Sequence, residues 1–165
     1  MRAAVLLLLS LAACDRTPVT TAPPDDSPGG RLEAAALDRG LIADPGKAGL
    51  AGSWGSETDR LCVVPAGGAL KLGASVDYGS DQACAASGTV VRAGDTLDVR
   101  FGACRFEARF EGDRIVFPAE LPRACDRFCT GRASLASLAV ERLSESISEA
   151  ATTRTAGGTL LCGPG

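Results

Sequence analysis

Residues 104–111, CRFEARFE, constrain the fold more than any other stretch of the chain. Apolar and charged residues alternate here without interruption, and the apolar positions are Cys104, Phe106, Ala108 and Phe110. Successive side chains of a strand point to opposite faces, so this period of two predicts an antiparallel strand with one buried and one solvated face. The same alternation over residues 70–78 and 97–101 predicts further strands of this kind.

Turn-forming residues separate the predicted strands at hairpin spacing. Ala93-Gly94-Asp95 and Gly112-Asp113 each lie between two consecutive strands. We expect six or seven strands between Gly52 and Phe117, in meander order. The predicted fold is therefore mainly β, a small antiparallel β meander that is either barrel-like or a sandwich. Residues 133–146 fit either a helix or a last strand that closes the sheet.

Two short helices are expected to flank the meander. RLEAAALDRG, residues 31–40, consists of strong helix formers and ends on a glycine suited to a helix C-terminus. Near the other end of the chain, Ser146 and Glu149 have the spacing of a capping box. This predicts a C-terminal helix from about Ile147 to Thr155.

The first residues have the pattern of an export signal. Met1-Arg2 is positively charged, and the nine residues from Ala3 to Leu11 are almost entirely apolar, too few for the roughly 20 that a membrane span needs. The motif Leu11-Ala12-Ala13-Cys14 then resembles the lipobox of bacterial lipoproteins. That resemblance implies cleavage before Cys14 and acylation of its sulfur.

These features divide the chain into three parts. Residues 1–13 are expected to be a lipoprotein signal peptide, and residues 14–30 a lipidated cysteine followed by a disordered, proline-rich tether. Residues 31–165 are expected to form a single β-rich domain braced by disulfides. The lipobox implies a bacterial cell-envelope location, with the domain facing the periplasm and the membrane as a partner through Cys14. Asp15 resembles an inner-membrane retention signal of enterobacteria, and the choice between inner and outer membrane stays open.

Setting Cys14 aside leaves an even number of cysteines. The six are Cys62, Cys84, Cys104, Cys125, Cys129 and Cys162. An exported chain folds in an oxidising compartment, so three disulfides are expected, although 15 pairings are possible. We predict a Cys62–Cys84 bridge across early strands, with the other two bridges formed among Cys104, Cys125, Cys129 and Cys162. Cys125 and Cys129 are close enough for half a metal or redox site, but a C-x-x-C spacing would be more typical, which favours two structural half-cystines.

Several kinds of chemistry lack the residues that they need. The chain has no His and no Asn, which excludes His-based catalytic triads and zinc sites with His ligands. Its formal net charge of −3 argues against a nucleic-acid partner, which would require a basic surface. No cofactor, metal or catalytic residue is predicted.

Paired carboxylates need separate attention because two acids suffice for glycoside hydrolysis. Glu107 and Glu111 share the charged face of residues 104–111 with Arg105 and Arg109. Such a ladder is typical of cross-strand ion pairing on a solvated surface rather than of a desolvated catalytic acid. The hydrolase alternative would instead use carboxylates near Glu120 to Arg132, or Lys71 with a serine.

Gly52-Ser53-Trp54 resembles the G-x-W motif that begins the first barrel strand of lipocalins. The resemblance implies that Trp54 packs at a closed barrel end against a late arginine, with Arg142 as the counterpart, and that the barrel carries a small ligand. The alternative is a tryptophan that fills a small β core, and packing favours this structural role for Trp54.

The preferred function is a non-enzymatic one: a binding, inhibitor-type or structural module anchored in the envelope. The architecture is similar to that of small bacterial lipoproteins that inhibit proteases or lysozymes through a disulfide-braced β domain. The alternatives are a lipocalin-like carrier and a small carboxylate-dependent hydrolase. An interior filled by Leu72, Val76, Val99, Phe106 and Phe110 would count against the carrier, and a lack of buried acids would count against the hydrolase.

Overall fold

The computed structural model describes residues 27–163, so the expected signal peptide, Cys14 and residues 15–26 of the tether lie outside the described residues. Helix α1 (Pro28–Asp38) begins three residues before the expected Arg31. The reason is local: the Ser27 hydroxyl accepts a hydrogen bond from the Gly30 N–H at 3.1 Å, and proline is favoured in the first helical turn. No helix within residues 27–163 has the length and apolar character to cross a bilayer.

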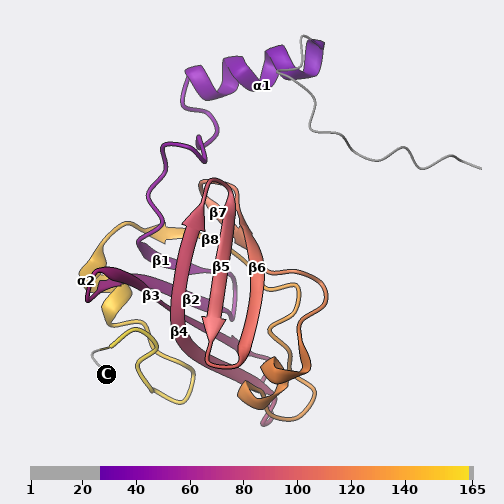
Figure 1. Ribbon diagram of the computed structural model, residues 1–165, viewed down its shortest axis with the longest axis vertical. Coiled ribbons are helices and arrows are strands. Elements are labelled where there is room, and N and C mark those ends of the chain that lie inside the picture. Colours follow the sequence, from indigo (N-terminus) through magenta and orange to yellow (C-terminus); the bar gives the residue numbers. More distant parts are fainter. Residues whose placement is uncertain (1–26, 164–165) are drawn as a thin grey trace, which may run out of the picture. The chain divides into compact units, whose positions relative to one another are not determined.

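In the described part of the chain, eight strands follow α1 and form a closed antiparallel barrel in meander order (Figure 1). Each strand is hydrogen-bonded to the next, and β8 is hydrogen-bonded back to β1. The strands are β1 (Gly52–Gly55), β2 (Arg60–Ala66), β3 (Ala69–Asp77), β4 (Ala83–Ala93), β5 (Thr96–Phe101), β6 (Cys104–Phe110), β7 (Arg114–Val116) and β8 (Ala139–Ser144). The predicted β meander is thereby confirmed, and it is a barrel rather than a sandwich.

Within residues 133–146, which the sequence left open between a helix and a closing strand, the structure has the strand β8. It pairs with β7 through Ile115 and Val140, and with β1 through Trp54 and Arg142. A meander of seven strands would leave β1 and β7 with unpaired edges, and β8 satisfies both. The segment is therefore the closing strand.

The barrel interior is one apolar cluster supplied by alternate residues of every strand. Its largest fully buried side chains include Trp54, Phe101, Phe110, Phe117, Leu61, Leu72, Leu97 and Ile115. Burial of a side chain of this size stabilises the fold by about 1.5–3 kcal/mol. The period of two in the sequence thus predicted the inward face correctly.

A second, smaller cluster lies on the outside of β2. Cys62 and Val64 pack there against Ala150 of helix α2 (Ile147–Ala151) and against Leu161 and Cys162 of the C-terminal segment. The Ser146 hydroxyl caps α2 by accepting from the Glu149 N–H at 3.3 Å, as predicted. The helix ends at Ala151, short of the expected Thr155. The Thr152 hydroxyl donates to the Glu149 carbonyl at 2.9 Å, a local bond of the kind that competes with further helix.

All six cysteines form disulfides, as predicted, but Cys62 and Cys84 are not joined to each other. The bridges are Cys62–Cys162, Cys84–Cys129 and Cys104–Cys125. The predicted Cys62–Cys84 bridge is wrong because Cys62 belongs to the outer cluster on β2, whereas Cys84 belongs to the barrel interior on β4. Two cysteines that face opposite sides of a sheet cannot be joined without moving the backbone.

Gly88 lies at a close approach between β4 and β5. A Cβ at this position would lie 1.9 Å from the carbonyl oxygen of Arg100, a rigid backbone atom. We expect Gly88→Ala to lower the free energy of unfolding by about 1–3 kcal/mol because the two strands must separate. Gly49→Ala is the matched control, since its Cβ would meet nothing within 4 Å. Denaturant unfolding followed by circular dichroism measures both, and equal stabilities would contradict this account.

Candidate functional site

One end of the barrel is closed by Trp54 and Arg142. The Arg142 guanidinium lies 4.0 Å from the centroid of the buried Trp54 ring, and the indole N–H donates to the Leu50 carbonyl at 3.2 Å. Arg142 also donates to the carbonyls of Gly49 and Gly112. Burial lowers the pKa of Arg142, an effect that the nearby Glu145 carboxylate opposes. The expected Trp54–Arg142 contact is therefore present, and its role here is structural.

A second arginine holds the same end of the barrel. The Arg92 guanidinium lies 4.4 Å from the centroid of the Phe110 ring and donates to the carbonyls of Ala48 and Pro45. Phe110 in turn packs edge-on against Trp54, with the ring centroids 5.9 Å apart. Arg92 and Arg142 thus hold the segment from Pro45 to Ala51 across the barrel end, because their guanidinium groups donate hydrogen bonds to its backbone carbonyls.

The opposite end is covered by the long connection between β7 and β8, drawn in orange in Figure 1. This connection contains the short helix η1 (Arg123–Phe128) and two half-cystines, Cys125 and Cys129. Leu135 and Leu138 from the same connection are buried in the main core. Both ends of the barrel are therefore covered by well-anchored backbone.

The residues named above as the test of a lipocalin-like carrier belong to the packed core or lie against it. Leu72, Val76, Val99 and Phe110 are at most 1% exposed, and Phe106 packs against them while remaining partly exposed. These are the residues whose inward packing would count against a carrier. A hollow of about 690 Å³ lies instead at the rim of the β2–β3 hairpin, lined mainly by Pro65, Leu70, Val90 and Val91.

The acidic residues do not form a desolvated pair. None of the described Asp and Glu side chains is buried, and Glu120 and Asp126 in the β7–β8 connection are exposed. Lys71 donates to the Gly163 carbonyl at 2.6 Å, so its ammonium group anchors the C-terminal segment. These observations give no support to either form of the predicted hydrolase alternative.

The charged ladder on β6 pairs along the strand rather than across it. Arg109 and Glu111 form an ion pair of 2.7 Å on one strand. Across the strands the register instead places Asp98 beside Glu107 and Arg100 beside Arg105. The predicted cross-strand pairing is therefore wrong on the β5 side, since like charges face one another there.

Cys125 and Cys129 belong to different disulfides, which confirms the prediction of two structural half-cystines. Within residues 27–163, no three Cys, Asp or Glu side chains gather in a way that would hold a metal ion. The remaining candidate for a binding site is a feature of the outer surface of the barrel.

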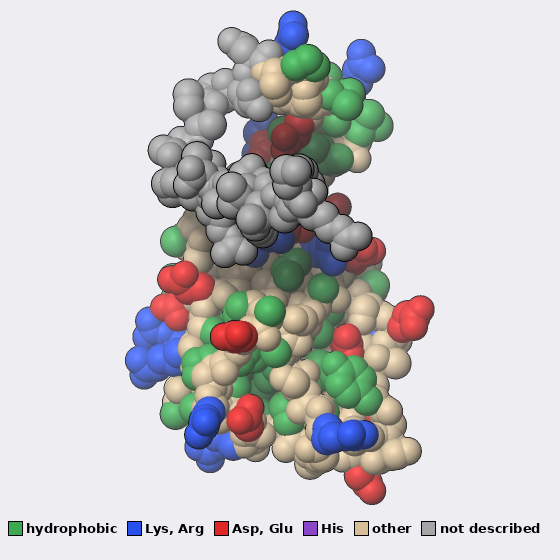
Figure 2. All heavy atoms as spheres, turned by 90° about the vertical axis from the view of Figure 1, so that its right-hand side faces the viewer, with side chains coloured by type: hydrophobic (Ala, Val, Ile, Leu, Met, Phe, Trp, Pro, Cys, Tyr) green, Lys and Arg blue, Asp and Glu red, His purple; other side chains and the backbone are tan. Residues whose placement is uncertain are grey.

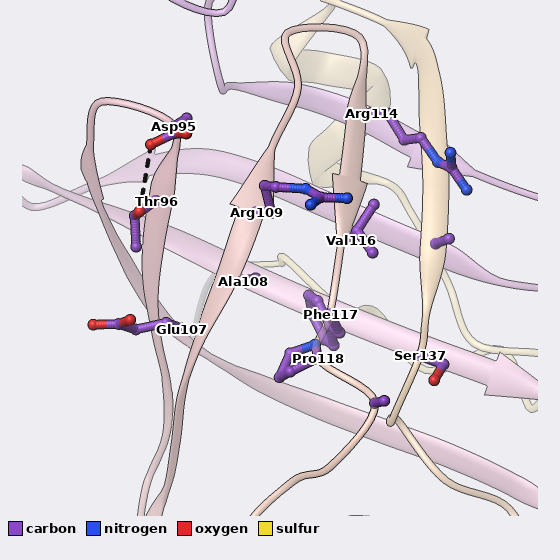
Figure 3. Close-up of a pocket in the computed structure, with 12 residues that line it drawn as sticks. Asp95, Thr96, Glu107, Ala108, Arg109, Arg114, Val116, Phe117, Pro118 and Ser137 are labelled. Atoms are coloured by element: carbon purple, nitrogen blue, oxygen red, sulfur yellow. Dashed lines mark hydrogen bonds between the residues drawn. The ribbon is translucent and has the colours of Figure 1, made fainter. Parts of the chain in front are cut away.

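A hollow of about 610 Å³ opens on the outer surface where β6 and β7 diverge (Figure 3). Its lining includes Ala108, Val116, Phe117, Pro118, Ala119 and Ala139. Strand β6 pairs with β5 over six residues but with β7 over only two, namely Arg109 with Val116 and Phe110 with Ile115. The hollow is thus a gap in the wall of the barrel whose floor is Phe117, itself 1% exposed.

Charged side chains surround this apolar floor. Figure 3 shows Arg109 reaching from β6 towards Val116, while Glu107 points the other way, towards β5. Arg114 lies at the β7 side, and Asp95 and Thr96 lie at the end of β5. Figure 2 shows the face of the molecule that lies on the right-hand side in Figure 1. Apolar side chains are exposed there between scattered acidic and basic side chains. An apolar floor with a polar rim is typical of a recognition site.

The sequence contained two signals of this gap. Pro118 follows Phe117 and has no N–H to extend the ladder with β6, and proline restricts the residue before it as well. The predicted strands also became irregular after Phe117. Neither signal shows that the chain stays bonded to the β8 side, where the Phe117 N–H donates to the Leu138 carbonyl at 2.8 Å.

Comparison with protein-family models, with curated protein sequences and with solved structures finds no match to this chain. The lipobox and the lipocalin-like motif therefore remain resemblances of short segments. The function must be inferred from the residues and geometry of this barrel.

Proposed function

We propose that this chain is a lipid-anchored module of the bacterial cell envelope that binds another protein through the outer surface of its barrel. The observation that carries the proposal is the barrel itself, which is packed throughout and covered at both ends, with a hollow of about 610 Å³ on its outer wall. Rigid, disulfide-braced surfaces suit binding because little conformational entropy is lost on association. The exposed carboxylates favour binding over hydrolysis.

The anchoring part of the proposal depends on Cys14. We expect Cys14→Ser to move nearly all of the protein from the membrane fraction to the soluble periplasmic fraction. Two or more acyl chains suffice for stable anchoring, and no basic cluster near Cys14 supplies a second membrane signal. Cell fractionation with intact-mass analysis measures this, and Ser10→Ala is the control that leaves the lipobox cysteine in place. An unacylated wild-type chain, or an unchanged distribution of the variant, would contradict the prediction.

The binding part is tested by affinity capture from detergent-solubilised envelope with the full chain as bait at physiological salt. A protein partner should be retained and should be released by an excess of the untagged chain. Recovery of lipid and non-specific membrane proteins alone, unaffected by the competitor, would remove the main support for a binding function.

A further inference from the structure

The geometry points to the free edge of β6 as a site for strand addition: we propose that an extended peptide segment with small apolar residues at alternate positions binds there and lays those side chains into the neighbouring hollow. This inference deepens the proposed binding function and rests on it for its biological context. Its first support is the register, in which Cys104 to Ala108 pair with β5 but with no residue of β7.

Backbone direction identifies the groups that face the gap. The Phe110 N–H donates to the Asp95 carbonyl on the β5 side, and the Glu111 N–H donates to the Arg114 carbonyl on the β7 side. Because backbone groups alternate along an antiparallel strand, those of Arg105 and Glu107 point to the β7 side. Within residues 27–163, the structure shows no backbone hydrogen bond from either residue to the segment 117–119. Two N–H and two C=O groups are therefore available to an added strand.

The segment across the gap cannot supply the missing bonds. Pro118 has no N–H, and its carbonyl accepts from the Ser137 N–H at 2.9 Å. The Phe117 N–H is likewise directed to Leu138. Phe117 and Pro118 thus pair with the β8 side. Since Cys125 lies beside Cys104, with the two Cα atoms 4.7 Å apart, the edge of β6 is left without a partner strand from Arg105 to Ala108, about 13 Å at 3.3 Å per residue.

The hollow beside this edge determines which side chains fit. A strand added to β6 would place every second side chain on the barrel side, over Ala108 and Phe117. Small apolar residues fit these positions, because the floor is apolar. This combination of main-chain hydrogen bonds with pockets for alternate side chains is the usual basis of peptide recognition by strand addition.

The remaining side chains of the added strand would lie among the outward-facing charges. Arg105 and Arg109 flank Glu107 on β6, whereas the Arg114 side chain of β7 points away from β6 towards β8, where its register partner is Glu141 (Figure 3). Arg109 is paired with Glu111, whereas the structure shows no ion pair for Arg105 or Arg114 among the described residues. Asp95 and Glu107 line the hollow together with Arg109 and Arg114, so the charges around it balance and favour neither sign in the added strand. Uncharged polar side chains at these positions meet no like charge.

The test uses the isotope-labelled full chain in detergent and capped five-residue peptides that alternate valine with serine. We expect saturable amide shifts confined to residues 105–109 and 117–119, and at least tenfold slower hydrogen exchange at Arg105 and Glu107. The same peptide with N-methyl groups on the bonding edge should bind at least tenfold more weakly, as should a peptide in which lysine replaces each valine, because the floor of the hollow is apolar. Absence of saturation at about 1 mM, or equal binding of the N-methylated peptide, would overturn the proposal.

Variants locate the site independently of the peptide. Ala139→Trp should fill the hollow and abolish peptide binding, whereas Val91→Trp, on the exposed face of β4, should leave binding unchanged. A wild-type dimer that Ala139→Trp dissociates would identify a second copy as the occupant and would overturn the peptide proposal.

The same variants separate this proposal from the general binding function. If Ala139→Trp bait still captures the competed envelope partner, the partner binds elsewhere and the gap at β6 is not its site. If the peptide binds at the gap but no envelope protein is captured, strand addition is supported and the proposed envelope function fails.

Discussion

Replacing Trp54 with alanine is expected to lower the free energy of unfolding by about 3–5 kcal/mol, the usual cost of truncating a buried tryptophan. Trp54 is fully buried, packs edge-on against Phe110 and lies under the Arg142 guanidinium. Its loss therefore leaves a cavity and also removes the ring against which the cation packs. Denaturant unfolding followed by circular dichroism measures the change, since Trp54 is the only tryptophan and fluorescence would be lost with it.

The control for this prediction is Val91→Ala. Val91 is 59% exposed, so its truncation should change the stability by no more than about 0.5 kcal/mol. A loss below about 1 kcal/mol for Trp54→Ala would show that the barrel end collapses around the smaller side chain. The cluster of Trp54, Phe110 and Arg142 would then not be what holds that end closed.

Removing the Cys62–Cys162 disulfide by a double change to alanine is expected to cost about 4.7 kcal/mol, because the bridge closes a loop of 100 residues and the stabilisation grows with loop length. The bridge attaches the C-terminal segment to β2. Without it, Leu161 and Cys162 are held mainly by bonds such as that from the Ser87 hydroxyl to the Leu161 carbonyl at 2.9 Å. Hydrogen exchange should therefore rise first in the C-terminal segment and α2.

The matched control is the Cys104–Cys125 pair. Its sequence separation of 21 residues, nearly five-fold shorter, gives an expected cost of about 3.3 kcal/mol by the same relation. All four sulfurs belong to buried residues, so the loss of packing on changing to alanine is similar for the two pairs. A larger loss for Cys104–Cys125 would show that core packing around the β7–β8 connection outweighs loop length.

Much of the fold followed from local patterns. The alternation in residues 104–111 correctly assigned the inward and outward faces of β6, and glycine turns placed the β4–β5 and β6–β7 hairpins. These features depend on residues only a few positions apart, and the period of two is a direct consequence of strand geometry. The capping serine of α2 was predictable for the same reason.

The candidate site was not predictable in this way. Glu107 and Arg109 were recognised as a solvated charged face, but nothing in the order of residues shows that β7 contains only three residues and then turns towards β8. The gap exists because Pro118 cannot continue the ladder and because Leu138 supplies the alternative acceptor. That acceptor lies 21 positions beyond Phe117 and reaches it only when the barrel closes.

The sequence by itself determined the strands within residues 70–78, 97–101 and 104–111, the face that each of these strands buries, and the even set of six cysteines. Tertiary structure decided which cysteines pair, that residues 139–144 close the barrel as β8, and that β6 keeps a free edge. The physical reason is the range of the interactions. Strand periodicity is local, whereas Cys62 finds its partner 100 residues away and β8 pairs with β1 across nearly the whole domain, so these choices depend on which surfaces meet when the core packs.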